Sequence, residues 1–120
     1  MVPQIKSTEI TEVPNLDPQG FDPEDPEDFC CTFGLTIGPM HSDGGEQFYL
    51  SVCSPRWMAR ECEKRGFFWG RNHLVVPCYD LTRIQELIGK FVETCSGDSW
   101  KEVAGKLGRI ASWEFDNYRE

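Results

Sequence analysis

The amino-acid sequence predicts an α+β fold: a small antiparallel sheet of three to five strands, one short helix between strands, and two helices at the C-terminal end. Apolar residues alternate with other residues over 29–37 and again over 48–53, which is the period of a strand with one buried face. From residue 81 onward they recur every three or four positions, which is the period of a helix. Because strands come first and helices last, we expect the helices to pack on one face of the sheet.

One domain is expected over residues 1–120, because a chain of this length that is 39% hydrophobic can form one core. Residues 1–20 read as a less regular N-terminal segment with a candidate edge strand over Ile5–Ile10, and the pattern becomes regular over 21–119. No secretory leader and no apolar run of membrane-spanning length is visible. We therefore expect a cytoplasmic protein whose six cysteines are reduced.

The clearest strand begins at residue 29, where Cys30 and Cys31 must point to opposite faces of the sheet. Neither a disulfide nor a shared metal between these two neighbours is therefore expected. The turn-rich stretch 38–47 leads to a second strand over 48–53, which predicts a hairpin with a long loop. A third strand is predicted over 73–79, at an edge or a bulge because Pro77 cannot donate a hydrogen bond.

Each predicted helix begins at a recognisable cap. Ser54 can cap a short helix over Pro55–Lys64, with the proline at the first helical position. Asp80 can cap the second helix, and Ser99 and Glu102 have the spacing of a capping box for the third. The apolar stripe of the third helix is then Trp100, Val103, Leu107 and Ile110.

The net charge of −8 is concentrated near one place in the chain. Residues 15–29 contain six acids and no lysine or arginine. Five of these acids lie in "FDPEDPEDF", residues 21–29, which we call the acidic loop: Asp22, Glu24, Asp25, Glu27 and Asp28. Asp25 precedes a proline and can cap one tight turn. A negative surface of this kind favours a partner of positive charge.

The sequence gives little support for catalysis or for a bound metal. The two histidines, His41 in a loop and His73 at the start of a strand, lie in no recognisable catalytic pattern, so a Cys–His enzyme is only a third alternative. The acidic loop lacks the glycine and the last glutamate of a calcium-binding loop, and no C-x-x-C pair is present. We expect no catalytic residue, no metal and no cofactor.

Basic and aromatic residues are interleaved in "RWMARECEKRGFFWGR", residues 56–71. Such a segment can bind nucleic acid, because cations contact phosphates and rings stack on bases. Glu61 and Glu63 reduce its positive charge, and the acidic chain as a whole repels a polyanion. A helix with a solvated basic face over buried rings is therefore favoured, and a nucleic-acid-associated or regulatory module is the alternative function.

Several separate strings in order along residues 20–119 resemble one known family. They are "PEDPEDF", "IGP", "FYLSVCSPRWM", "FWGRNHLVV", "ETCSGDSWKEVAGKLGRI" and "WEFDNYR". Together they resemble the immunity protein 8 family of bacterial polymorphic toxin systems. The resemblance implies a non-catalytic antidote that binds the C-terminal domain of a cognate toxin in the cytoplasm, as in contact-dependent growth inhibition. It also implies that the toxin is a nuclease, and a nuclease that grips phosphates is basic.

The resemblance supplies no toxin-contacting positions. Discrimination between toxins needs surfaces that differ among antidotes, so we expect specificity in Met40–Gln47 and Ala59–Phe68, which lie outside the family-like strings. The candidate partner-binding residues are Asp22, Glu24, Asp25, Glu27, Asp28, His41, Asp43, Glu46, Arg60 and Lys64.

Overall fold

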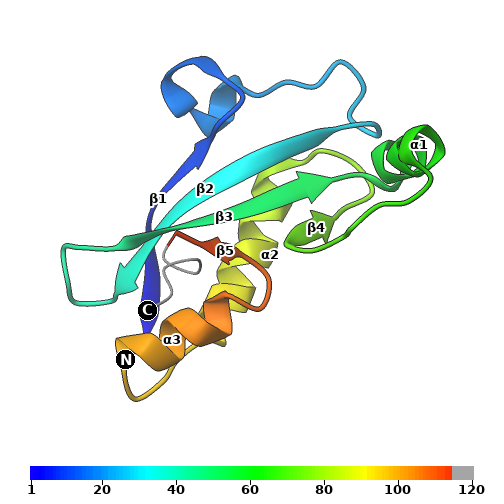
Figure 1. Cartoon of the computed structure of the whole chain (residues 1–120). Helices are drawn as coiled ribbons and strands as arrows, with labels where there is room; N and C mark the ends of the chain where they lie inside the picture. The colour runs from blue at the N-terminus through cyan, green and yellow to red at the C-terminus, as the bar shows by residue number, and fades with distance from the viewer. Residues whose placement is uncertain (115–120) are drawn as a thin grey trace.

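The computed structural model describes residues 1–114, and it confirms the predicted α+β class (Figure 1). The strands within these residues are β1 (Pro3–Ile10), β2 (Cys30–Pro39), β3 (Glu46–Cys53), β4 (His73–Val75) and β5 (Ser112–Trp113). The helices of the same part are α1 (Pro55–Arg65), α2 (Leu81–Glu93) and α3 (Trp100–Leu107), with two 3₁₀ turns, η1 (Pro14–Leu16) and η2 (Pro18–Gly20). Residues 115–119, which end the predicted family-like region, lie outside the described part.

The sheet has the strand order β1-β2-β3-β4, and β5 also pairs with β3. The pairs β1–β2, β2–β3 and β3–β5 are antiparallel, whereas β4 runs parallel to Ser51–Cys53 of β3. The free edge of β3 is thus shared, with β4 along its second half and β5 along Phe48–Tyr49. The parallel pair arises because α1 and the segment 66–72 after it bring the chain back to the level of Ser51 before β4 begins.

Most predicted boundaries agree with the structure within one or two residues. The candidate strand over Ile5–Ile10 lies inside β1, which is the edge of the sheet. The third strand is shorter than expected and ends at Val75, because Pro77 has no N–H to extend the ladder. The third helix ends at Leu107, so Ile110 of the predicted stripe follows the helix and packs against the core from outside it.

The core lies between the sheet and two helices, α2 and α3, which cover the same face of the sheet (Figure 1). The alternating residues of the central strands point into it, as predicted: Cys31, Phe33, Leu35, Ile37, Phe48, Leu50 and Val52. The helices contribute Ile84, Ile88, Val92, Val103 and Leu107. Cys30 lies on the opposite face of the sheet, directly across from Cys53. No helix within residues 1–114 is both long and apolar enough to cross a bilayer.

Helix α1 differs from the other two helices because none of its residues is buried. It begins with Ser54 as its cap and Pro55 at its first position, as predicted, and it ends at Gly66, which adopts the left-handed conformation with a φ of 83°. Its apolar side chains, Trp57 and Met58, are only half-buried. Helix α1 therefore lies beside the end of the sheet and outside the core (Figure 1).

Candidate partner-binding surface

The acidic loop is fixed to the body of the protein by aromatic rings. Phe21 and Phe29, which begin and end the loop, both contact the ring of Tyr79, with ring centroids 5.0 and 5.3 Å away in edge-on geometry. The backbone N–H of Tyr79 also donates a hydrogen bond of 2.7 Å to the carbonyl of Pro26. The loop is thus held at both ends and in its middle, so its carboxylates are presented from a defined backbone.

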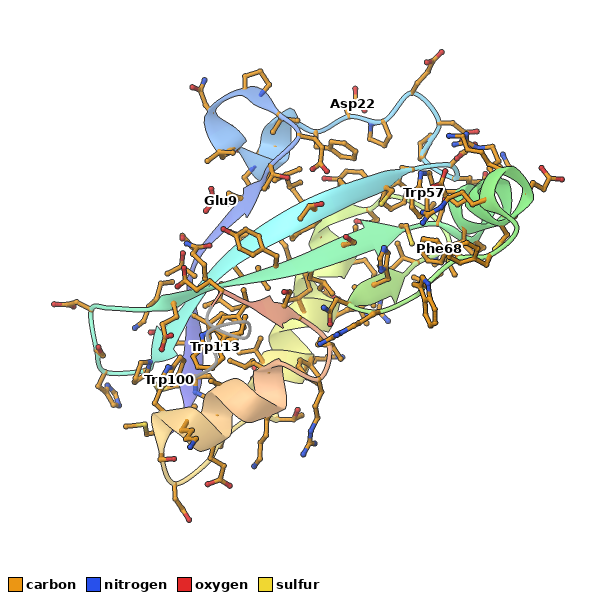
Figure 2. The ribbon with its side chains drawn as sticks, viewed as in Figure 1. Glu9, Asp22, Trp57, Phe68, Trp100 and Trp113 are labelled. Carbon is orange, nitrogen blue, oxygen red and sulfur yellow. The ribbon has the colours of Figure 1, made fainter. Side chains whose placement is uncertain are left out.

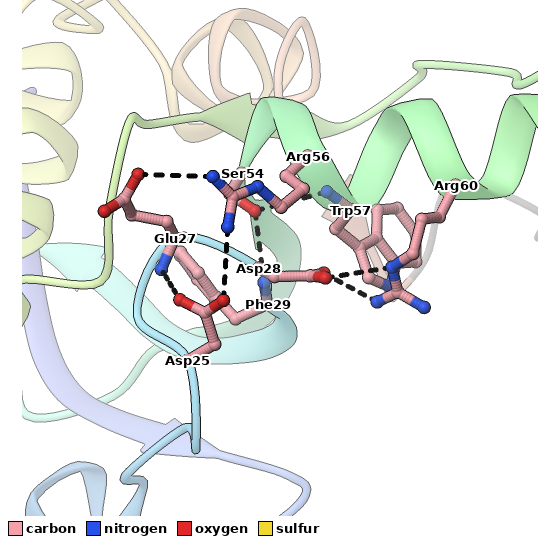
Figure 3. A network of polar contacts seen from close by, with 8 residues as sticks. All are labelled: Asp25, Glu27, Asp28, Phe29, Ser54, Arg56, Trp57 and Arg60. Atoms are coloured by element: carbon pink, nitrogen blue, oxygen red, sulfur yellow. Dashed lines mark hydrogen bonds and ion pairs between the residues drawn. The ribbon is translucent and has the colours of Figure 1, made fainter.

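Ion pairs connect the same loop to α1 (Figure 3). The guanidinium of Arg60 donates to both carboxylate oxygens of Asp28, at 2.6 and 2.9 Å, and these hydrogen bonds raise the pKa of Arg60 above its ordinary value. Arg56 lies 3.3 Å from Asp25 and 3.7 Å from Glu27. The predicted tight turn is confirmed, because the Asp25 carboxylate accepts a hydrogen bond from the N–H of Glu27 at 2.9 Å.

Ser54 joins the acidic loop to the first turn of α1. Its hydroxyl oxygen accepts hydrogen bonds from the N–H of Phe29 at 3.1 Å and from the N–H of Trp57 at 3.4 Å. Ser54 is fully buried, and its bond with Phe29 is buried as well, whereas the bond with Trp57 is partly buried. One side chain therefore sets where the loop ends and where the helix begins.

Asp22 and Glu24 differ from the other acids of the loop because no basic side chain of residues 1–114 pairs with them. Both are exposed to solvent. The other three acids of the loop are partly neutralised by Arg56 and Arg60. The negative field at this end of the molecule therefore comes mainly from two carboxylates.

An exposed aromatic loop, residues 66–70, follows α1. Phe67 is 49% exposed and Trp69 is 78% exposed, although both are large apolar side chains. Their rings contact one another edge-on with centroids 6.4 Å apart, and the guanidinium carbon of Arg65 lies 5.3 Å from the centre of the Phe67 ring. Phe67, Phe68 and Trp69 line a shallow hollow of about 330 Å³.

The aromatic loop stands on a second set of rings. Phe68 contacts Trp57 at 5.4 Å between ring centroids (Figure 2). Phe68 also contacts His73 at 4.9 Å, and Trp57 stacks on His73. The Nδ1 atom of His73 is 2.6 Å from the carbonyl oxygen of Arg71. His73 is therefore part of the packing between α1 and β4.

The structure divides nine of the ten predicted binding residues into two groups, and the tenth, Glu46, lies apart from both. Seven lie on the acidic loop or α1: Asp22, Glu24, Asp25, Glu27, Asp28, Arg60 and Lys64. His41 and Asp43 are exposed at the other end of the sheet, in the loop between β2 and β3. The β2–β3 ladder runs from the pair Cys30–Cys53 at one end to the pair Ile37–Glu46 at the other. These ends are seven residues apart, so the two groups are separated by about 24 Å along the strands.

Glu46 has an internal role. Its carboxylate accepts a hydrogen bond of 2.9 Å from the indole nitrogen of Trp113 and another from the indole nitrogen of Trp100. Both tryptophans are partly buried against the core. Glu46 thus ties α3 and β5 to the start of β3, and its charge is directed inward.

The expectation that the rings of residues 56–71 lie buried under a basic helix is wrong for Phe67 and Trp69. The left-handed Gly66 ends α1 and turns the chain outward before these rings begin. The glycines at 66 and 70 on either side of "FFW" were the signal for a projecting loop. Within residues 1–114, no cluster of three or more histidine, cysteine or acidic side chains could hold a metal ion.

A family model described as Immunity protein 8 matches residues 3–118. The chain belongs to the Immunity protein 8 family. No curated protein and no solved structure matches it. Membership makes the chain an immunity protein of a polymorphic toxin system, whose partner is a cognate toxin. The matched range includes both the acidic loop and the aromatic loop, so this immunity protein carries them as parts of its family domain.

Proposed function

We propose that this immunity protein neutralises a basic nuclease toxin by forming a stoichiometric complex through its acidic loop and α1, in the cytoplasm and without chemistry of its own. The observation that carries the proposal is the fixed acidic loop, in which Asp22 and Glu24 are exposed to solvent. A nuclease groove must attract phosphates and is therefore positive. An acidic surface complementary to it would speed association by about ten- to a thousandfold at low salt.

The contacts of α1 argue against the nucleic-acid alternative. Arg56 and Arg60 are two of the basic residues that such a function needs, and both are bound to carboxylates of the acidic loop. A polyanion approaching α1 would also meet the exposed carboxylates of the loop. Purified protein should therefore leave RNA and DNA unshifted at low salt.

The first test is protection of cells. Co-expression with the toxin domain encoded in the adjacent reading frame should restore growth, and the two proteins should co-purify in a one-to-one complex. Continued killing without a complex in the pull-down would refute the proposed function.

The second test locates the charge that matters. The double variant Asp22→Lys and Glu24→Lys should slow association with the toxin domain and flatten its salt dependence, with little change in the dissociation rate. The matched control is Glu93→Lys with Asp98→Lys, which makes the same change in net charge at two exposed sites away from α1. An equal effect of both double variants would show that only net charge matters, and a larger effect of the control would place the contact elsewhere.

A further inference from the structure

We propose that the aromatic loop is the apolar anchor of the toxin complex: Phe67 and Trp69 insert into an apolar pocket that lysine and arginine side chains border on the toxin domain. This inference rests on the proposed function, and it names the side chains that hold the complex once charge has brought the partners together. The acidic loop then mainly sets the rate of association, and the aromatic loop mainly sets the rate of dissociation.

The exposure of the two rings is the first observation. A soluble protein buries large rings when it can, and a cluster of exposed rings marks a surface that another molecule covers. Trp69 is 78% exposed and Phe67 is 49% exposed, at adjacent places in one loop. Tryptophan and arginine dominate the few residues that carry most of the energy of protein interfaces, and Arg65 lies against this pair.

The rigidity of the loop is the second observation. Phe67 and Trp69 contact each other, and Phe68 between them is fixed against Trp57 and His73. Rings already held in place lose less conformational freedom when a partner arrives. The loop is therefore suited to anchoring, because its side chains need little further ordering.

The position of the loop is the third observation. The acidic loop is bonded to α1 through Arg56 and Arg60, and the aromatic loop follows the last turn of the same helix. A helix of eleven residues is about 16 Å long, so one partner surface of ordinary size can reach both loops. Since no residue of α1 is buried, the surface between the loops is open to that partner.

The charges of this surface favour a basic protein as its partner. The acidic loop and residues 56–71 together contain seven acids and five basic residues. Two copies of a chain with a net charge of −8 repel one another, and a nucleic acid is repelled by the exposed carboxylates. A protein with an apolar pocket inside a positive rim satisfies both the rings and the carboxylates.

The experiment measures binding kinetics with the toxin domain encoded in the adjacent reading frame. Trp69→Ala and Phe67→Ala should each raise the dissociation rate, by about thirtyfold for Trp69 if it is a central anchor, and change the association rate by less than about threefold. Trp69→Phe, which keeps an aromatic ring, should recover part of the loss. Tyr49→Ala and Val2→Ala are the controls, because they remove side chains of 39% and 43% exposure outside the acidic loop, α1 and the aromatic loop and should leave the dissociation rate unchanged.

A spectroscopic readout separates a direct contact from a structural effect. Complex formation should shift the indole emission to shorter wavelength in the unchanged protein, because Trp69 leaves water, and most of this shift should be absent in Trp69→Phe. The free Trp69→Ala variant should unfold at the same temperature as the unchanged protein, since the removed ring is mostly in solvent.

Three outcomes would overturn the inference while the proposed function stands. One is a double variant Trp69→Ala and Phe67→Ala that dissociates from the toxin domain at the unchanged rate. Another is an equal loss in Tyr49→Ala or Val2→Ala. The last is a dimer of the free protein that Trp69→Ala abolishes, which would assign the loop to a second copy. Failure of the unchanged protein to bind the toxin domain would instead refute the proposed function.

Discussion

Glu46 accepts a hydrogen bond of 2.9 Å from the indole nitrogen of Trp113, across 67 residues of sequence. The other carboxylate oxygen accepts from the indole nitrogen of Trp100. One carboxylate thus connects the first residue of β3, the first residue of α3 and the last residue of β5. The last described segment of the chain is fastened to the sheet through this side chain.

Glu46→Gln should lower the free energy of unfolding. The amide has only one oxygen, and its NH₂ group faces the second indole, so one part-buried indole N–H loses its hydrogen bond to residue 46. We expect a loss of about 1–3 kcal/mol, measured by urea unfolding. Asp43→Asn is the control, because Asp43 is exposed in the loop between β2 and β3 and should change the stability by less than about 0.5 kcal/mol. Equal stability of the two variants would contradict the role given to Glu46.

Ser54→Ala should cost more stability than the loss of an ordinary helix cap. Removing the hydroxyl leaves both Phe29 and Trp57 with a backbone N–H that lacks its acceptor, at a fully buried position. We expect a loss above the roughly 1 kcal/mol typical of a cap. Ser99→Ala provides the comparison, since exposed Ser99 caps α3 through one bond to the N–H of Glu102. If urea unfolding gives the same cost for both, the link between the acidic loop and α1 is weaker than the geometry indicates.

Tyr79→Phe should reduce the loss of stability at alkaline pH. Burial, followed by the nearby Cys31 and Asp22, raises the pKa of Tyr79 to about 12, whereas a free tyrosine ionises near pH 10. Between these values the unfolded chain has released a proton that the folded protein keeps, so the free energy of unfolding falls as the pH rises. Phenylalanine removes this contribution. The slope that remains includes Cys31, whose pKa burial also raises to about 12.

The same substitution should not destabilise the protein at pH 7. Within residues 1–114 the Tyr79 hydroxyl is buried without a hydrogen-bond partner. Its removal should leave the free energy of unfolding unchanged or raise it by about 1 kcal/mol. Urea unfolding at pH 7, 10 and 11.5 tests both statements. An unchanged slope between pH 10 and 11.5 would contradict the shift in the pKa of Tyr79.

Oxidised glutathione should produce a disulfide between Cys30 and Cys53. The two residues are direct cross-strand neighbours. The carbonyl of Cys53 accepts a hydrogen bond from the N–H of Val76, on the side of β3 away from β2. Cys30 and Cys53 are therefore a non-hydrogen-bonded pair of the β2–β3 ladder. Such a pair has Cα atoms about 4.5 Å apart, within the range that a disulfide bridges. A hydrogen bond between the thiols raises the pKa of Cys30 and lowers that of Cys53, so Cys53 supplies the thiolate.

The exchange passes two hydrogens from the thiols to oxidised glutathione and releases two reduced glutathiones. Peptide mass mapping should find the Cys30–Cys53 link, and Cys30→Ser should abolish it. The exposed Cys62 and Cys78 are internal controls, since each should carry only a glutathione adduct. Adducts at those two sites with no cross-link would show that the pair is too well shielded to react.

The parts of the fold predicted from the sequence are those that depend on near neighbours in the chain. Ser54, Asp80 and Ser99 each accept a bond from an N–H three residues later, so their caps are visible in a short window. Strand β5 has only two residues, which is too short for a period to appear. The parallel direction of β4 depends on where α1 delivers the chain, and no local pattern encodes that path.

The sequence predicts only part of the candidate surface, because its contacts join residues that are far apart in the chain. The acids of residues 22–28 are evident as a run, but the pair between Asp28 and Arg60 joins positions 32 residues apart. The predicted basic helix and the predicted acidic loop are therefore one bonded unit, which neither segment alone indicates. Composition also could not tell which rings face solvent, because the exposure of Phe67 and Trp69 follows from the turn at Gly66.

Helix α1 has a consequence for how this protein can change over generations. Substitutions at exposed positions usually alter the free energy of unfolding by less than about 0.5 kcal/mol, and no position of α1 is buried. Most side chains of this helix can therefore be exchanged while the sheet, α2 and α3 remain as they are. An antidote that must follow a mutating toxin gains from such an arrangement, since new recognition can arise at α1 without the loss of a folded protein.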